Sequence, residues 1–233
     1  QTFRITYTAT DAAGCATERV VTIRVSGPPV ITASQSVLNV CVGDTATFTV
    51  QASDTDPGNV VLSAAGVPAG LTFTPVLPVG GNPVATTATF TPTAAGTSVV
   101  TFTATDADGG THTTTVTLNV SQRPVFGGDT PAEGSELVVN VGDTLQYTVT
   151  ASDPDGGQVT LTASGVPGDL EHNPNLPADG ASVTTTASYT PEPSDAGQTF
   201  TVTYTATDDS GAACAATRSF RIRVNDLPQI TVS

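Results

Sequence analysis

The stretch Thr45-Ala46-Thr47-Phe48-Thr49-Val50-Gln51-Ala52 alternates strictly between polar and apolar side chains. An alternation with a period of two places the apolar residues on one face of a β-strand and the threonines on the other. The same pattern recurs at 100–105 and 200–206, and clusters of turn-forming residues, such as 54–59, separate these segments. Because no stretch shows the 3.6-residue period of a helix, the sequence predicts an all-β fold.

Internal repeats extend outward from this stretch. Val-Gly-Asp-Thr at 42–45 returns at 141–144, and Gly-Val-Pro at 66–68 returns at 165–167, each with an offset of 99 residues. About seven short strands in roughly 100 residues, separated by frequent turns, is the pattern of a sandwich of two antiparallel sheets. We therefore predict one β-sandwich for each repeat.

A third motif, Ala-Thr-Asp, occurs at 9–11, 104–106 and 206–208 and extends the repeat pattern to both ends of the chain. The repeats divide the chain into four segments. We predict that residues 27–121 and 122–225 are two complete repeats. Residues 1–26 would be the last strands of a preceding repeat, and 226–233 the first strand of a following one. Such a pattern indicates that the chain is part of a longer tandem array of repeats.

Composition limits the function. The 233 residues contain 7 basic side chains, all arginine, against 21 acidic ones, a formal net charge of −14. This balance argues against binding to nucleic acid or to an anionic membrane, and no apolar run reaches the ~18–20 residues that a membrane helix needs. His112 and His172 occupy unrelated places in the two repeats, where we expect exposed side chains. Because no catalytic constellation recurs and the chain has no Trp for an aromatic-lined cleft, we predict that it is not an enzyme.

Four segments carry a resemblance to known families. The Asp-x-Asp segment at 50–59 resembles the cadherin and dystroglycan-type cadherin-like pattern, the segments 66–73 and 90–96 are similar to bacterial putative immunoglobulin-like repeats, and 7–15 looks like the end of a hyalin-type repeat. The resemblance implies tandem immunoglobulin-like (cadherin-like) β-sandwiches, arranged head to tail in a secreted or surface-exposed protein. It implies an adhesive or spacing role and no enzyme.

Each repeat places four aspartates in loops that lie at one end of a sandwich. They are Asp54, Asp56, Asp106 and Asp108 in the first repeat, and Asp153, Asp155, Asp208 and Asp209 in the second. Like charges brought together repel, and a calcium ion with 6–8 oxygen ligands would resolve that repulsion. The alternative is that these aspartates cap turns, with Arg123 pairing with Asp153 or Asp208, since the linkers at 26–29 and 121–124 carry no acid.

The three cysteines suggest a bond between repeats. Cys15 and Cys214 occupy equivalent positions, and Cys41 has Asn140 as its counterpart in the second repeat. In a head-to-tail array the base of one repeat faces the tip of the next, so we predict a Cys41–Cys214 disulfide and a partner for Cys15 outside this segment. Free buried thiols and links between chains are the alternatives. A disulfide would indicate an oxidising compartment.

Three functional hypotheses follow. The first is a structural repeat region that forms an extracellular fibre, stalk or surface-layer element, with neighbouring repeats and other copies of itself as partners. The second is a calcium-stiffened adhesin that binds a protein or glycan. The third is a passive spacer of a secreted enzyme. Because the repeats differ mainly in their loops, the sequence favours the first.

Overall fold

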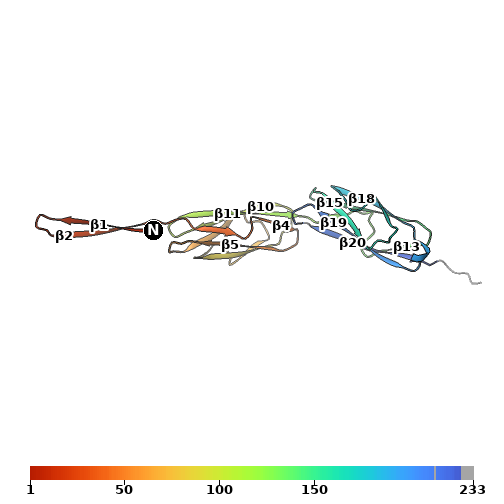
Figure 1. Ribbon diagram of the computed structural model, residues 1–233, viewed down its shortest axis with the longest axis horizontal. Helices are drawn as coiled ribbons and strands as arrows, with labels where there is room; N and C mark the ends of the chain where they lie inside the picture. Colours follow the sequence, from red (N-terminus) through yellow and green to blue (C-terminus); the bar gives the residue numbers. More distant parts are fainter. Residues whose placement is uncertain (213, 227–233) are drawn as a thin grey trace, which may run out of the picture. The chain divides into compact units, whose positions relative to one another are not determined.

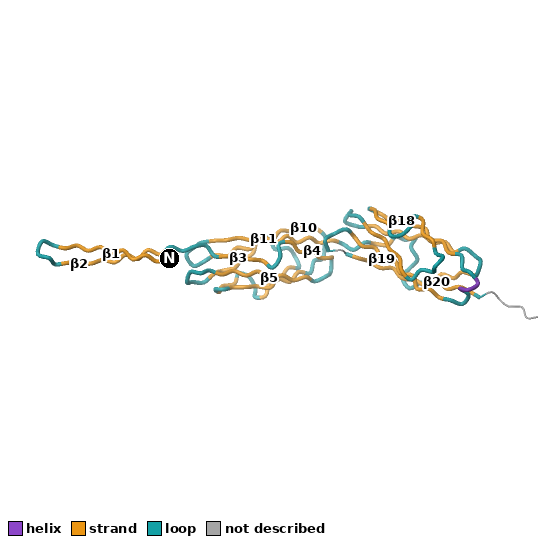
Figure 2. The backbone as a smooth tube through the Cα atoms, viewed as in Figure 1, coloured by secondary structure: helices purple, strands orange, loops and turns teal. Residues whose placement is uncertain are grey.

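The computed structural model describes residues 1–212 and 214–226 (Figure 1). Strands form nearly all of its regular structure, and the helical content of the described residues is one 3-10 turn, η1 (Pro193–Asp195) (Figure 2). The predicted all-β fold is confirmed. Among the described residues, no helix is long and apolar enough to cross a membrane.

Two compact units divide the chain. The first contains Gln1–Leu38, Ala46–Phe90 and Ser98–Leu118, and the second contains Asn39–Thr45, Thr91–Thr97 and the residues from Asn119 onward. Two short segments of the first repeat, which carry Cys41 and Gly96, therefore belong to the same unit as the second repeat.

The first repeat is a sandwich of two sheets. Their strand orders are β3-β5-β9-β7 and β4-β11-β10-β6-β8. The strands are β3 (Val30–Ala33), β4 (Val37–Cys41), β5 (Ala46–Ser53), β6 (Val60–Ala65), β7 (Leu71–Thr74), β8 (Val79–Gly81), β9 (Val84–Phe90), β10 (Gly96–Thr105) and β11 (Thr111–Ser121). As the alternation requires, Phe48, Val50 and Ala52 of β5 are buried, while Thr49 and Gln51 between them are exposed.

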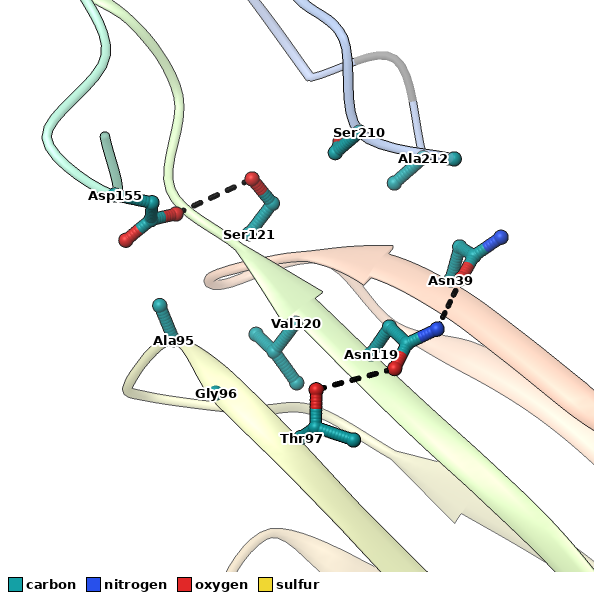
Figure 3. A pocket seen from close by; sticks show the side chains of 11 residues that line it. Asn39, Ala95, Gly96, Thr97, Asn119, Val120, Ser121, Asp155, Ser210 and Ala212 are labelled. Atoms are coloured by element: carbon teal, nitrogen blue, oxygen red, sulfur yellow. Dashed lines mark hydrogen bonds between the residues drawn. The ribbon is translucent and has the colours of Figure 1, made fainter. Parts of the chain in front are cut away.

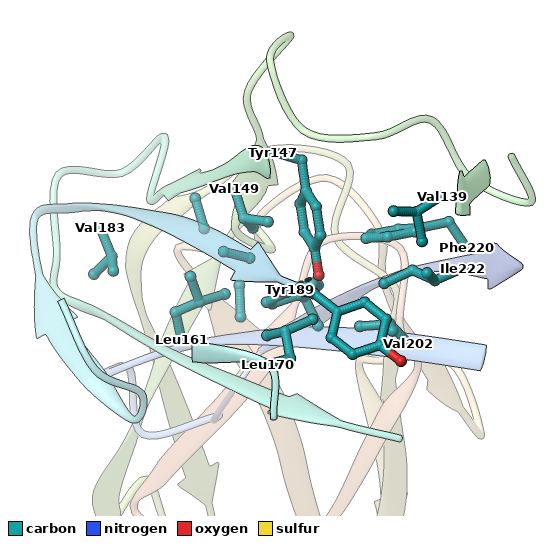
Figure 4. Close-up of a cluster of buried hydrophobic side chains, with 14 of the residues drawn as sticks. Val139, Tyr147, Val149, Leu161, Leu170, Val183, Tyr189, Val202, Phe220 and Ile222 are labelled. Carbon is teal, nitrogen blue, oxygen red and sulfur yellow. Dashed lines mark hydrogen bonds between the residues drawn. The ribbon is translucent and has the colours of Figure 1, made fainter. Parts of the chain in front are cut away.

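The second repeat has the same topology, strand for strand. Its sheets run β12-β14-β18-β16 and β13-β20-β19-β15-β17. The strands are β12 (Val125–Phe126), β13 (Glu136–Asn140), β14 (Leu145–Ser152), β15 (Val159–Ser164), β16 (Glu171–Asn173), β17 (Ala178–Gly180), β18 (Ser182–Tyr189), β19 (Thr199–Asp208) and β20 (Ala215–Asn225). Figure 4 shows its core, in which Val149, Leu161 and Ile222 are fully buried.

Aromatic side chains occupy equivalent places in the two cores but differ in polarity. In the first repeat, Phe48 and Phe73 each meet Phe102 edge to face, with ring centroids about 6 Å apart. In the second repeat, Tyr147 and His172 meet Tyr204 in the same edge-to-face way. The apolar cluster of the first repeat is thus a hydrogen-bonding cluster in the second. 

A separate hairpin precedes the first sandwich. Strands β1 (Thr2–Thr10) and β2 (Ala16–Arg24) pair antiparallel, with Phe3 opposite Ile23 and Ile5 opposite Val21. These four apolar side chains share one face and are all exposed. In β10–β11 and β19–β20, the hairpins that end the two sandwiches, the corresponding face is buried. The strand expected within 226–233 lies, from residue 227 on, outside the described residues.

Candidate functional site

The first aspartate of the Asp-x-Asp loop in the first repeat closes a local turn. Asp54 Oδ1 accepts the N–H of Asp56 at 2.8 Å, as an Asx-turn requires. Asn82, which sequence reasoning missed, holds the same loop, because its side-chain amide accepts from the Asp54 N–H and donates to the carbonyls of Asp54, Asp56 and Gly58. The loop is therefore ordered by hydrogen bonds within the protein.

Asp56 is held by the linker that leads into the sandwich. Its Oδ2 accepts the N–H of Gly27 at 2.9 Å and the hydroxyl of Ser26 at 3.0 Å. The bonds from Gly27 and Ser26 lower the pKa of Asp56, because they stabilise the charged carboxylate.

The second loop of this tip forms another Asx-turn and an ion pair. Asp106 Oδ1 accepts the N–H groups of Asp108 and Gly110 at 2.9 and 2.8 Å. Arg24 Nη2 lies 3.2 Å from Asp108 Oδ2 and donates to the Pro57 carbonyl at 3.0 Å. Both partners of the ion pair are substantially exposed, so the pair contributes little to stability, but it supplies one positive charge to the acidic tip.

Two carboxylate oxygens at this tip accept no hydrogen bond from the described residues. Asp54 Oδ2 and Asp106 Oδ2 are buried and have no hydrogen-bond partner among the described residues. Gly110 covers Asp106, because a Cβ there would lie 2.5 Å from Oδ2. Across the described residues, no group of three or more His, Cys, Asp or Glu side chains is arranged to hold a metal ion. Only two carboxylate oxygens at this tip are thus free of hydrogen bonds among the described residues, whereas a calcium ion takes 6–8 oxygen ligands.

The aspartates of the second repeat have donors for their carboxylates. Asp153 accepts the N–H groups of Asp155 and Gly157, and Asp155 accepts the N–H of Gln122 and the hydroxyl of Ser121. Ser121 thus repeats the role of Ser26 one repeat later, and the recurrence of Val-Ser at 25–26 and 120–121 is the sequence signal that could have identified both serines.

Asp208 is the most buried of these carboxylates, at 5% exposure. Its Oδ1 accepts the N–H of Cys214 at 2.9 Å and both donors of Ser210, and its Oδ2 accepts the hydroxyl of Ser121 at 2.8 Å. Asp209 is exposed and accepts one N–H, from Gln158. The turn-capping role predicted as the alternative to calcium is what these contacts show.

The expected pairing of Arg123 with Asp153 or Asp208 is wrong. Arg123 Nη2 instead lies 2.7 Å from both carboxylate oxygens of Asp44, and Nη1 donates to the carbonyl of Val42. The reason is that Asp153 and Asp208 already have N–H and hydroxyl donors, whereas the Val-Gly-Asp turn presents a free carboxylate.

Cys41 and Cys214, the predicted pair, are joined by a disulfide with a Cα–Cα distance of 5.7 Å, inside the usual range. Both residues are buried and both belong to the second compact unit. Cys15 lies in the β1–β2 turn, is exposed and has no disulfide partner within the described residues.

A pocket of about 490 Å³ is lined by residues that include Asn39, Gly96, Asn119 and Ser210 (Figure 3). Asn119 crosses it, accepting from the Thr97 hydroxyl and donating to Asn39 Oδ1 at 2.9 Å. A Cβ at Gly211 would lie too close to the Asn39 amide, so a larger residue at this loop position would require the Asn39 side chain to move. The polar groups of the pocket are thus largely bonded to one another.

The second repeat also contains a hydrogen-bond relay that sequence reasoning missed. The hydroxyls of Tyr147 and Tyr204 lie 3.0 Å apart, and His172 Nε2 lies 2.8 Å from the Tyr204 oxygen. The expectation of an exposed His172 is wrong, because its ring occupies the place of Phe73 and is half-buried. Burial lowers the pKa of His172 and raises that of Tyr147 to about 12.

Several solved structures are similar in fold. An I-band fragment of titin is 15% identical, with 87% of this chain and 67% of that chain covered and a TM-score of 0.48. The fibronectin(III)-like modules of Clostridium thermocellum CbhA are 17% identical, covering 88% and 100%, at 0.39. The sialic acid binding region of a Streptococcus sanguinis adhesin is 14% identical, covering 86% and 78%, at 0.35.

No curated protein matches the sequence. The family described as bacterial Ig domain matches twice in tandem, over residues 26–119 and 122–225. Immunoglobulin-like families are typically structural or adhesion modules rather than enzymes, and the bacterial domains are often extracellular. The two equivalent sandwiches and the two family matches agree, and the chain belongs to the bacterial immunoglobulin-domain family.

Proposed function

We propose that this chain is a structural repeat region of a secreted or cell-surface protein, in which tandem sandwiches form an extracellular fibre, stalk or surface-layer element. The observation that carries the proposal is the Cys41–Cys214 disulfide, which covalently links one family match to the next. A domain that functions by itself does not need a covalent bond to its neighbour. A bond between neighbouring repeats is useful in an array whose repeats must stay joined under load.

The same bond supports an extracellular location. Disulfides persist in oxidising compartments and are rare where thiols are kept reduced. A chain that lacks Lys and carries a net charge of −14 is also well suited to stay soluble at high local concentration.

We also propose that the hairpin β1–β2 belongs to a further repeat. A two-stranded hairpin is marginal in water by itself, and this one exposes Phe3, Ile5 and Ile23 on one face. The equivalent hairpins β10–β11 and β19–β20 bury that face in a sandwich. The partner of this face would be the remaining strands of a neighbouring repeat, and Cys15 would pair with a cysteine there. 

A calcium site at the tip of the first repeat is a second candidate, and it would favour the adhesin reading over a passive spacer. The buried, unpaired oxygens of Asp54 and Asp106 support it. Thermal unfolding with calcium and then with chelator tests it. A rise in Tm that Asp106→Asn removes supports the site, and an unchanged Tm rejects it.

Electron microscopy of the native full-length protein, oxidised and then reduced, tests the structural role. Ordered filaments or sheets that lose order on reduction are the expected result, and would add other copies of the chain as partners. Isolated threads indifferent to reduction would reject a fibre or surface-layer role and favour the spacer.

A further inference from the structure

A groove of about 740 Å³ runs along β16, the edge strand of its sheet in the second repeat. Amides, hydroxyls and a carboxylate make up most of its lining, including Gln146, Glu171, Asn173 and Asn175, while Leu170 and Leu176 supply its apolar part. Small-ligand sites are concave, and placed polar groups in them fix the orientation of the ligand.

The sheet register aligns part of this lining in one row. Gln146 lies opposite Ser188 on β18, and Ser188 lies opposite Glu171 on β16. Residues paired in this way point to the same face of a sheet, and neighbouring strands lie roughly 4.8 Å apart. An amide, a hydroxyl and a carboxylate therefore span roughly 10 Å of surface.

The first repeat serves as an internal comparison, because it builds the same strands with other residues. At the positions 99 residues earlier, Gln146, Glu171 and Asn173 are each replaced by threonine, and Asn175 by Val76. The sandwich forms equally well with those smaller side chains. The polar lining is therefore not required by the fold.

His172 lies between Glu171 and Asn173 on β16, so its side chain points to the opposite face of the sheet, toward the core. Its Nε2 is held by the Tyr204 hydroxyl, which is held in turn by Tyr147. 

We propose that this groove binds a neutral saccharide through Gln146, Glu171 and Asn173. Amide groups donate and accept at neighbouring atoms and a carboxylate accepts, which together match hydroxyls that do both. The lining contains no Arg, and the net charge of −14 disfavours an anionic ligand. The polar lining also disfavours an apolar one. This inference is independent of the structural role proposed above.

Titration of the isotopically labelled 1–233 chain with maltotriose, diacetylchitobiose and N-acetyllactosamine, followed by amide NMR, tests the proposal. We expect saturable shifts of amides around Gln146, Glu171 and Asn173 with at least one of these sugars. The variant Gln146→Thr/Glu171→Thr/Asn173→Thr restores the first-repeat residues and so should fold. Because it removes hydrogen bonds to a charged and two amide groups, binding should weaken roughly tenfold or more.

Gln51→Thr, an exposed position on β5 of the first repeat, is the matched control and should leave binding unchanged. The absence of shifts with all three sugars overturns the proposal, as does binding that the triple variant retains. A short peptide of alternating Thr and Val that shifts the β16 amides, when the sugars do not, would assign the edge to strand addition and also overturn it.

Discussion

The phenolic oxygens of Tyr147 and Tyr204 lie 3.0 Å apart in the core of the second repeat, where the first repeat has only phenylalanine rings in contact. His172 completes the chain of hydrogen bonds on the far side of Tyr204. Two sandwiches with one topology thus differ in whether their central aromatic cluster contains polar atoms that must be paired.

Tyr204→Phe should destabilise the second repeat by about 1–3 kcal/mol, because it leaves the buried Tyr147 hydroxyl and His172 Nε2 without their shared partner. The triple variant Tyr147→Phe/His172→Phe/Tyr204→Phe reproduces the cluster of the first repeat and should recover most of that loss. Urea unfolding of both variants measures the difference. A triple variant less stable than Tyr204→Phe would contradict the account.

Acidification should weaken the second repeat. Burial lowers the pKa of His172 in the folded state, whereas the unfolded residue titrates near 6.5. The folded state therefore binds fewer protons, so this contribution to stability is present above about pH 6.5 and is lost as pH falls through the folded pKa. Denaturant unfolding at neutral and mildly acidic pH measures it.

His172→Phe should remove this part of the pH dependence, since phenylalanine does not titrate. The matched control is His112→Phe, because His112 is exposed on β11. An unfolding midpoint that responds to pH identically in the parent chain and in His172→Phe would show that the imidazole is not the titrating group.

Loss of the disulfide should lower the free energy of unfolding by about 2–4 kcal/mol. Cys41→Ser/Cys214→Ser is the test, and Cys15→Ser is the control that should leave stability unchanged. Non-reducing peptide mapping of the native chain should yield a Cys41–Cys214 peptide. Its absence, or an effect of Cys15→Ser equal to that of the pair, would count against the assigned bond.

Asp208→Ala should destabilise the loop that carries Cys214 by about 1–3 kcal/mol, because the N–H of Cys214 and the two donors of Ser210 lose their buried acceptor. Asp209→Ala is the neighbouring control, with an exposed side chain and one bond to a backbone N–H. It should change stability by less than about 0.5 kcal/mol. Equal effects in chemical unfolding would refute the assigned role of Asp208.

The strands and the core could be predicted from sequence because both depend on a local pattern. The alternation around Phe48 and Val50 places these side chains inside the sandwich, as the structure does. The pairing of Cys41 with Cys214 could also be selected, since equivalent positions in the repeats limited the choices.

The contacts of the site could not be predicted, because they depend on where loops far apart in sequence meet. Arg123 binds Asp44, 79 residues away, and the hydroxyl of Ser121 meets Asp208 across 87 residues. The relay through His172 was missed for a different reason. His172 takes the place that Phe73 has in the first repeat. In sequence this difference suggests an exposed histidine, and its partly buried role becomes clear only when the structure places Tyr147 and Tyr204 close to it.

The disulfide has a mechanical consequence that follows from connectivity alone. Cys41 and Cys214 are 173 positions apart in the chain. When force pulls on the two ends, the load crosses the sulfur–sulfur bond, and the residues enclosed by it carry no tension. Roughly 600 Å of contour length is thereby withheld from extension until a reductant opens the bond. An oxidised array would resist stretching, and a reduced one would lengthen by unfolding its repeats.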